Sequence, residues 1–371
     1  MENEGASPFA ELPQALVEET LGQADDLAKT LSGSFKKIMT EKKAIREKLI
    51  NKGLLKNEND VIQAPSYPTT CGVDGSYDVR KLLATDIAAI ASVAVEGLVP
   101  PKETKFWEQP RHISKIATLP HAEYNELVAR AIMMTMELEL SAKAPHDVVF
   151  IDGSLTTALI YLNQALNRLS DTPPELSNFL KERLGAALDS YQEVLDSPKS
   201  DKIYAALPKY TSRKEIANAV GLSSYEDRGL LSFILAPSEL VGPFQLEQPT
   251  QKWHIDKPLT FASKFEKIID SLGTIYVFYY RPFLHSPTLR VETSSAVAKN
   301  TQRLAVLLEA LKSQCVSAGM MEPYPLYLAD RMVKHLGTAL PAIVKAMTQE
   351  ISIEWDDDLG SVYLAMHGYR T

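Results

Sequence analysis

Residues 148–154 read Val148-Val149-Phe150-Ile151-Asp152-Gly153-Ser154, an apolar run that ends in Asp-Gly-Ser. A β-branched run that stops at Asp-Gly is typical of a buried strand followed by a turn, which leaves the carboxylate free at the strand end. The same tripeptide ends a second run, Cys71-Gly72-Val73-Asp74-Gly75-Ser76. A single Asp-Gly is most often a plain turn. Two such carboxylates at strand ends of one α/β sheet can converge on a metal ion.

The composition is that of an ordinary globular protein. The chain has 371 residues, of which 45% are hydrophobic and 23% charged, enough for one elaborated domain or two smaller ones. It contains no apolar run long enough for a membrane span, and its start, Met1-Glu2-Asn3-Glu4, lacks the features of a secretory signal, so we expect a cytoplasmic protein. Cys71 and Cys315 are far apart, which indicates neither a disulfide framework nor a zinc site.

The charge balance limits how this chain can meet nucleic acid. Its formal net charge is −8 and its pI is near 5.5. Binding through bulk electrostatics requires Lys and Arg to neutralise phosphates, so the acidic balance argues against it. A protein of this charge that acts on DNA needs a local basic groove or a partner that delivers the strand.

The first sixty residues have a helical pattern. We expect two helices between Leu16 and Leu55, broken near Gly33, and a helical extension over residues 1–63. The second half is basic, and this charge is either a solvated helix face or an element for docking or DNA entry; it comes from Lys36, Lys37, Lys42, Lys43, Arg46, Lys48 and Lys52. A linker over residues 64–70 follows.

A firm helix is expected over residues 121–143, between the two Asp-Gly-Ser segments. Glu137 and Glu139 fall on opposite flanks of its apolar stripe, and the helical wheel does not choose which of them faces a site at the sheet edge. Both are otherwise ordinary helix-boundary carboxylates. Residues 77–99, which precede this helix, fit either strands or a buried helix.

The remaining elements follow from turn residues and periodicity. After the strand at residues 147–152 we expect a helix over 155–169 capped by Ser154, an inserted helical pair near 171–200, and a strand over 202–207. That strand ends at a basic loop, residues 208–214, which is either a phosphate contact or a plain exposed loop. A short helix from 224, a loop at Gly242-Pro243, a hairpin of 274–281 with 289–292, and helices over 294–318 and 324–340 complete the chain.

These motifs, taken in order, resemble the NurA nuclease family. The resemblance covers residues 71–335 and rests on Val73-Asp74-Gly75-Ser76, a Glu on a helix, Ile151-Asp152-Gly153-Ser154-Leu155, Lys209-x-Thr211-Ser212, Asp227-Arg228-x-Leu230-Leu231, Tyr279-Tyr280-Arg281, Arg290-x-Glu292 and Pro323-Tyr324-Pro325-Leu326-x-x-Ala329-Asp330. Each motif alone is weak, whereas eight in the same order are fairly specific.

The resemblance implies an α/β fold of the ribonuclease H-like class, a mixed central sheet flanked by helices. A nuclease domain would span residues 71–345, with the helical insertion near 171–200 and a C-terminal tail over 346–371. It also implies a Mn²⁺- or Mg²⁺-dependent DNA nuclease, active on single strands. Such proteins work as dimers docked on a hexameric HerA-type ATPase, in DNA end processing or in defence against phage.

The resemblance further implies roles for individual residues. Asp74, Asp152 and Glu137 would bind metal, Glu137 being preferred because its separation from Asp152 is closer to the family's, and Lys209 would contact substrate or order the site. The family pattern expects a Tyr and a His where this chain has Glu322 and Asp330. Asp330 would then replace imidazole with an oxygen ligand that suits Mg²⁺ or Mn²⁺. His335 is expected to be a surface residue.

The implied mechanism uses two divalent ions held by Asp74, Glu137, Asp152 and Asp330; one activates water and the other neutralises the leaving 3′ oxygen. Lys209, Arg281 and Arg290 would steady the DNA backbone, and Tyr280 would stack on splayed bases. The missing Tyr and His leave open an alternative, a catalytically silent scaffold that regulates the ATPase. A weaker alternative is an actin-like sugar or acetate kinase, although no glycine-rich phosphate loop lies near Asp74 or Asp152.

Overall fold

One mixed β-sheet organises the chain. The computed structural model describes residues 12–61, 66–82, 85–101, 103–247, 255 and 259–354. Within them, nine strands form a sheet in the order β1-β7-β8-β9-β6-β5-β2-β3-β4. Their bounds are β1 Leu55–Asn57, β2 Thr70–Lys81, β3 Asp86–Glu96, β4 Arg111–Leu119, β5 Val148–Asp152, β6 Ile203–Leu207, β7 Glu239–Gln245, β8 Tyr276–Arg281 and β9 Leu289–Thr293.

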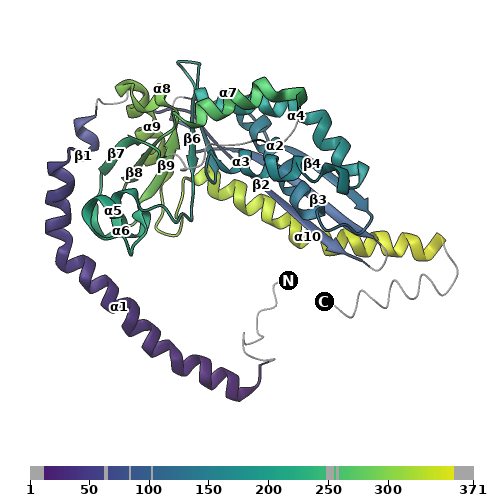
Figure 1. The fold of residues 1–371 in the computed structure, drawn as a ribbon, viewed down its shortest axis with the longest axis horizontal. Coiled ribbons are helices and arrows are strands. Elements are labelled where there is room, and N and C mark those ends of the chain that lie inside the picture. The colour runs from purple at the N-terminus through teal and green to yellow at the C-terminus, as the bar shows by residue number, and fades with distance from the viewer. Residues whose placement is uncertain are drawn as a thin grey trace.

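Strands β2, β5 and β6 run parallel to one another, and the other neighbouring strands pair antiparallel. Of the segment 77–99, which the sequence left open, residues 77–81 and 86–96 lie in β2 and β3, two long strands paired from Cys71 with Glu96 to Lys81 with Asp86. The predicted hairpin of β8 with β9 is confirmed. The ribonuclease H-like mixed sheet flanked by helices is confirmed as well (Figure 1).

Helices cover both faces of the sheet. One face packs on α2 (Asn125–Lys143), α3 (Thr157–Leu166), α4 (Pro174–Asp196) and α7 (Ala262–Leu272), and the other on α9 (Thr301–Gln314) and α10 (Tyr324–Glu354). The alternation along β3 shows this directly, since Ala88 and Ile90 join the core under α2, whereas Ile87 and Ala89 contact Leu340 and Val344 of α10. The site described below therefore lies between two helical layers.

Strand β5 is apolar throughout because both of its sides are covered. Val149 and Ile151 point into the core beneath α2, and Val148 and Phe150 point into the core beneath α9. A central parallel strand covered on both faces shows a continuous apolar run in its sequence. The run therefore stops where the covering stops, at Asp152.

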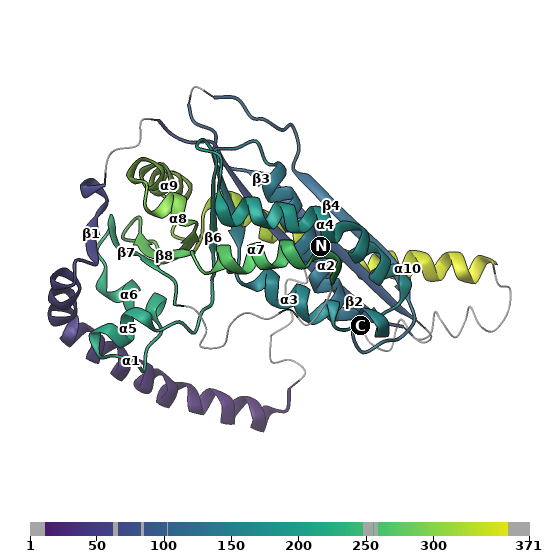
Figure 2. The same cartoon turned by 45° about the horizontal axis from the view of Figure 1, so that its top comes forward.

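The N-terminal helix differs from the prediction of two helices. Helix α1 runs unbroken from Gln14 to Asn51 through Gly33, an exposed position where glycine costs a helix only about 1 kcal/mol. Its second half is anchored by buried Ile38, Ile45 and Leu49. Arg46 adds two contacts of 2.6 Å to Glu239. Figure 1 and Figure 2 both show its first half leaving the body of the molecule.

Three other predictions are corrected. The expected pair over 171–200 is a single helix, α4, after a short 3-10 turn at Leu169–Asp171. The expected helix over 294–318 is split into α8 (Ser295–Ala298) and α9, because the side chain of Asn300 caps α9 by accepting from the backbone N–H groups of Gln302 and Arg303. Gly242 and Pro243 lie inside strand β7 rather than in a loop.

The predicted domain boundaries do not coincide with breaks in the structure. Strand β1, inside the expected extension 1–63, pairs with β7 at the sheet edge, and α10 passes through residue 345 without interruption. The boundaries stay predictions, and residues 62–65 of the linker region and 355–371 of the tail lie outside the described residues. Short helices α5 (Glu215–Val220) and α6 (Asp227–Ile234) complete the fold.

No helix among the described residues has both the length and the apolar character that crossing a bilayer requires.

Candidate metal centre

The register of two parallel strands brings Asp74 and Asp152 together. Strands β2 and β5 pair from Thr70 with Val148 to Val73 with Ile151, so the two aspartates are the next residues along neighbouring strands. Only one of them ends its strand. Strand β5 stops at Asp152 and Gly153 turns with φ 78°, whereas β2 continues past Asp74 and Gly75 to Lys81, paired with β3. The turn predicted at residues 74–76 is therefore wrong.

A third aspartate reaches the same place from the far end of the chain. Asp330 lies near the start of α10, on the face of the sheet that this helix covers. One carboxylate oxygen from each of Asp74, Asp152 and Asp330 lies within 4.8 Å of the other two. The structure thus gathers three carboxylates that are spread along the chain from residue 74 to residue 330.

Glu137 approaches from the opposite helical layer. A Cβ atom placed on Gly75 would lie 2.5 Å from its Oε1, so only glycine allows this carboxylate to come so close to β2. Glu137, Asp74 and Asp152 line one cavity of about 140 Å³. Glu139 turns away and pairs with Arg183 at 2.7 Å and with Lys143 at 3.6 Å. Of the two glutamates that the sequence left open, Glu137 is the one that faces the aspartates.

Lys209 occupies the centre of the carboxylate cluster. It follows strand β6, whose Leu207 is paired with Asp152. Its Nζ lies 3.6 Å from Asp152, 3.4 Å from Asp330 and 3.1 Å from Glu322. The backbone of the loop is held from below, since Arg228 donates to the carbonyl oxygen of Lys209. The ammonium group therefore balances part of the negative charge of the cluster.

Three of the four carboxyl groups have raised pKa values, and the fourth has a lowered one. Burial and the charge of Asp152 raise the pKa of Asp74 to about 8. Burial, with Asp74 and Asp152 nearby, also raises the pKa of Glu137 well above its ordinary value. Burial raises the pKa of Asp152 although Lys209 opposes it. Asp330 differs, because Lys334 at 2.8 Å and Lys209 outweigh its partial desolvation and lower its pKa.

The donor set fits a hard divalent cation. It consists of carboxylate oxygens only, the ligand type that Mg²⁺ and Mn²⁺ prefer over soft metals. Asp152 Oδ1 is buried and has no hydrogen-bond partner among the residues that the structure describes, which leaves a lone pair for a cation. The aspartates and Lys209 also line an open pocket of about 470 Å³. A cation here would relieve the mutual repulsion that raises the pKa values.

Three predicted DNA contacts are corrected, two of them by burial and the third, Arg281, by the hydrogen bonds that its guanidinium already makes. Tyr280 is 0% exposed and its hydroxyl donates to Glu58, so its ring cannot stack on a base. Arg290 is 1% exposed and its guanidinium is bonded to Glu292 and Tyr279. Arg281 donates to the backbone carbonyl oxygens of Ser232, Leu235, Leu284 and Ser286. These side chains hold the β7–β9 region together.

The structure adds two residues that the sequence did not single out as site residues. Glu322, which occupies the position of the family's Tyr, turns its carboxylate toward Lys209. Tyr210, the neighbour of Lys209, lines the mouth of the larger pocket and is 95% exposed. The basic loop gave a signal for Tyr210, whereas Glu322 was visible only as a departure from the family pattern.

Comparisons with known proteins agree with this architecture. Residues 68–335 match the NurA domain family. The crystal structure of the NurA nuclease from Sulfolobus solfataricus has a TM-score of 0.60 at 12% identity, covering 90% of this chain and 98% of that chain. A NurA structure with manganese has a TM-score of 0.55 at 14% identity and covers 88% and 98%, respectively. One bound to dAMP and manganese has 0.52 at 13% identity and covers 84% and 93%. At these identities the likeness shows the fold alone. No curated protein matches the chain.

Proposed function

Because the chain belongs to the NurA domain family, we propose that it is a metal-dependent nuclease that hydrolyses phosphodiester bonds of DNA. The observation that carries this proposal is the cluster of Asp74, Asp152 and Asp330, whose oxygens lie within 4.8 Å of one another at the mouth of an open pocket. Solved NurA structures that share the fold contain manganese, in one case together with dAMP. The cofactor we propose is therefore Mn²⁺ or Mg²⁺.

Four carboxylates would hold the metal, and we propose two ions. Asp74, Asp152 and Asp330 supply one side of the cluster, and Glu137 supplies the other from α2. When bound, such ions lower the pKa of water and neutralise charge on a leaving oxygen. They also change the sign of the local field, which lets an acidic pocket accept a phosphodiester.

Lys209 has a second role once a cation takes over the charge of the cluster. Its ammonium is shared among Asp152, Asp330 and Glu322. With a cation bound, the ammonium would be free to bind a phosphate oxygen at the pocket, and Glu322 would keep the side chain directed toward the cluster. Tyr210 lies beside it, exposed, and offers a ring on which an unstacked base can lie. This arrangement favours single-stranded DNA.

The replacement of the family's His and Tyr does not remove the site. Asp330 faces the other aspartates and supplies an oxygen ligand in place of imidazole. Glu322 has no phenol, but it holds the lysine. In a silent scaffold, the alternative function, nothing requires Asp330 to point into the cluster, so the observed orientation supports the enzyme. The family assignment likewise replaces the kinase alternative.

The charge of the whole chain supports a partner. A net charge of −8 disfavours capture of DNA by the protein alone. We therefore propose that it works as a homodimer on a hexameric HerA-type ATPase that delivers DNA, in the cytoplasm, during end processing or phage defence. The basic, anchored half of α1 is one candidate docking element, although Arg46 and Lys48 already contact Glu239 and the carbonyl oxygen of Val220.

The test is Mn²⁺-dependent digestion of a single-stranded oligonucleotide with the ATPase present. Wild type is compared with Asp74→Ala and Asp152→Ala, and with Asp171→Ala, which removes an exposed carboxylate away from the site. Loss of a metal ligand removes several kcal/mol of transition-state stabilisation, so each site variant is expected to lose about a hundredfold or more in rate. Full activity in either site variant would refute the proposed function.

A further inference from the structure

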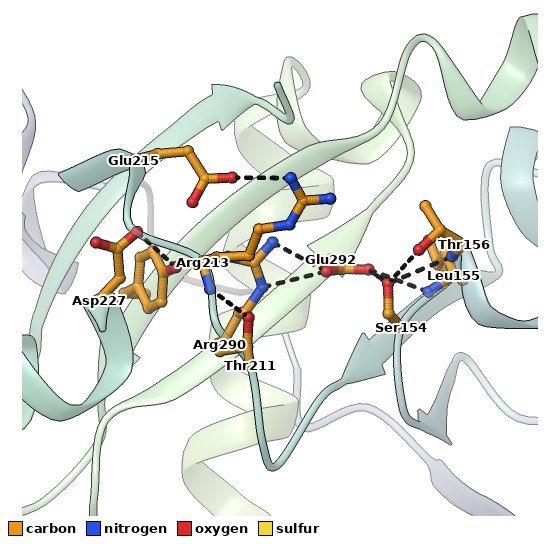
Figure 3. Close-up of polar contacts among 10 residues, drawn as sticks. Ser154, Leu155, Thr156, Thr211, Arg213, Glu215, Asp227, Arg290 and Glu292 are labelled. Atoms are coloured by element: carbon orange, nitrogen blue, oxygen red, sulfur yellow. Dashed lines mark hydrogen bonds and ion pairs between the residues drawn. The ribbon is translucent and has the colours of Figure 1, made fainter. Parts of the chain in front are cut away.

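A chain of buried polar contacts starts at the loop that follows Asp152. Ser154 Oγ and the backbone N–H of Leu155 donate to Glu292 Oε2, at 2.7 and 3.0 Å. The other oxygen of Glu292 accepts two bonds from Arg290, at 3.1 and 3.0 Å. We call the connected side chains the Glu292 relay; it comprises Ser154, Glu292, Arg290, Tyr279 and Asp227 (Figure 3).

The relay continues to the opposite side of the site. Arg290 Nη1 donates to the hydroxyl of Tyr279 at 2.5 Å, and that hydroxyl donates to Asp227 at 3.1 Å. Asp227 accepts the backbone N–H groups of Ile216 and Ala217, at 3.1 and 2.7 Å, which fixes the start of α5. Figure 3 shows Glu292 between the Ser154 loop and Arg290, with Asp227 on the side of Arg290 that faces away from Glu292.

Both loops that carry site residues are tied to the relay. The backbone N–H of Asp227 donates to the carbonyl oxygen of Arg213 at 2.9 Å, and Arg213 N–H donates to Thr211 Oγ1 at 3.1 Å, two residues after Lys209. The relay therefore connects the backbone behind Asp152 to the loop behind Lys209. Three motifs supply no metal ligand but take part in this connection. They are Asp227-Arg228, Tyr279 and Arg290-x-Glu292; Arg228 contributes by donating to the carbonyl oxygen of Lys209.

The side chain of Asp152 has little support of its own. Within the described part of the chain its Oδ1 has no hydrogen-bond partner, its Oδ2 lies 3.6 Å from Lys209, and the other group that supports its charge is the backbone N–H of the adjacent Gly153. The carboxylate must therefore be placed by its backbone, and the backbone of residues 154 and 155 is held by Glu292. Groups that orient a ligand from behind in this way tune metal affinity although they do not touch the metal.

The ion pair inside the relay is suited to placement rather than to stability. Glu292 is 2% exposed and Arg290 is 1% exposed, so both charges are removed from water. Buried ion pairs of this kind commonly add little net stability over an apolar pair, but they fix geometry when every hydrogen bond is made. Both oxygens of Glu292 accept hydrogen bonds from donors of fixed direction. The Ser154 loop is therefore held in a single position relative to Arg290.

We propose that Glu292 is a positioning residue for the metal site, which acts through Ser154 and Leu155 to hold Asp152 ready for a divalent cation. This inference rests on the proposed function, because it concerns the same metal. It gives Arg290 a role as the fixed counter-charge of Glu292. Tyr279 and Asp227 extend the same support to the Lys209 loop.

The test is Mn²⁺ affinity, measured by titrating Mn²⁺ alone into the full-length, metal-free protein. Ser154→Ala removes one of the two donors to Glu292 Oε2 and is expected to weaken Mn²⁺ binding about tenfold, the lower end of the effect of losing an outer support. Ser154→Thr keeps the hydroxyl and is expected to restore most of the affinity. Ser294→Ala, which removes a buried cap hydroxyl at the start of α8, is the matched control and leaves the affinity unchanged.

A second variant tests the carboxylate itself. Glu292→Gln places an amide NH₂ toward either Arg290 or Ser154, so one side of the residue loses its acceptor, and Mn²⁺ affinity is expected to fall further than in Ser154→Ala. If this variant does not fold, Ser154→Ala still decides. Wild-type affinity in Ser154→Ala, or an equal loss in Ser294→Ala, would overturn the positioning role. A wild-type protein that binds no Mn²⁺ would instead overturn the proposed function.

Discussion

At the scale of single residues, the site is an arrangement of charges that oppose one another. Asp74 is the most informative, because burial and its neighbour Asp152 raise its pKa to about 8. A carboxyl group whose pKa is higher in the folded state than in the unfolded state keeps a proton that the unfolded chain has released. The metal-free protein should therefore lose stability as the pH rises from about 4 towards 8.

Asp74→Asn tests whether the buried charge of Asp74 destabilises the metal-free protein. The neutral amide removes the repulsion, so the metal-free variant is expected to be more stable than wild type at pH 8, by roughly 1–3 kcal/mol, with a smaller difference at pH 5. Urea unfolding in EDTA at both pH values measures it. The same variant should lose binding of Mn²⁺. Asp171→Asn, an exposed control, should change neither property. Equal stabilisation at both pH values would show that charge repulsion is not the cause.

Tyr210 gives a second prediction at this scale. Its ring is 95% exposed beside Lys209, and a stacked base contributes about 1–3 kcal/mol. In Tyr210→Ala the KM for a single-stranded substrate should rise about tenfold, while Mn²⁺ affinity stays at the wild-type value. Tyr67→Ala, at an exposed tyrosine that lines a different pocket, should leave the KM unchanged. An unchanged KM in Tyr210→Ala would exclude stacking on this ring.

At the scale of elements, glycine sets the distance between strand β2 and helix α2. A Cβ on Gly75 would lie 2.5 Å from Glu137 Oε1 and 2.6 Å from Met133 Cγ. Gly75→Ala is therefore expected to cost about 1–3 kcal/mol and to weaken Mn²⁺ binding, because Glu137 must move. In Gly22→Ala, where the helix is exposed and the new methyl group meets nothing within 4 Å, neither the stability of the core nor Mn²⁺ affinity should fall. Denaturant unfolding and Mn²⁺ titration compare the two; wild-type Mn²⁺ affinity in Gly75→Ala would contradict the role of Glu137.

Helix α1 divides into two functional halves. Its second half buries Ile38, Ile45 and Leu49, each worth about 1.5–3 kcal/mol, whereas the first half is exposed in the described residues. Deleting residues 1–34 should leave the stability of the core nearly unchanged. Deleting residues 1–60 also removes strand β1 and should unfold the protein or greatly destabilise it. Equal unfolding midpoints for the two truncations, measured by circular dichroism, would contradict this division.

The elements also show what the sequence can and cannot predict. The β5 run and the order of the motifs identified the sheet and the family, because periodicity and strand ends are local properties. The resemblance pointed to Asp74, Asp152 and Asp330, which the structure brings together. Which of Glu137 and Glu139 faces the site depended on Gly75 and Arg183, which lie far from both in the chain. Tyr280 and Arg290 were misjudged because exposure is a tertiary property, and Arg281 because it donates to backbone carbonyl oxygens that lie far from it in the chain. The continuation of β2 past Asp74 depended on its pairing with β3.

At the scale of the whole molecule, a net charge of −8 makes unaided DNA capture weak. Digestion of single-stranded DNA at about 0.15 M salt should therefore be several times faster with a HerA-type ATPase than without it, and the difference should shrink as the salt concentration is lowered. Equal rates at both salt concentrations would refute dependence on the partner. The Asp152→Ala variant, purified in the same way, distinguishes digestion by this protein from digestion by a contaminating nuclease.

The central claim is that strands β2 and β5 and helix α10 together form a divalent cation site. The most direct measurement is anomalous diffraction at the manganese absorption edge from crystals soaked in Mn²⁺. The expected result is an anomalous peak within coordination distance of carboxylate oxygens of Asp74, Asp152 and Asp330. The Lys209 ammonium should then have moved away from these oxygens. A well-ordered site with no peak there, and with Lys209 still among the carboxylates, would contradict the claim.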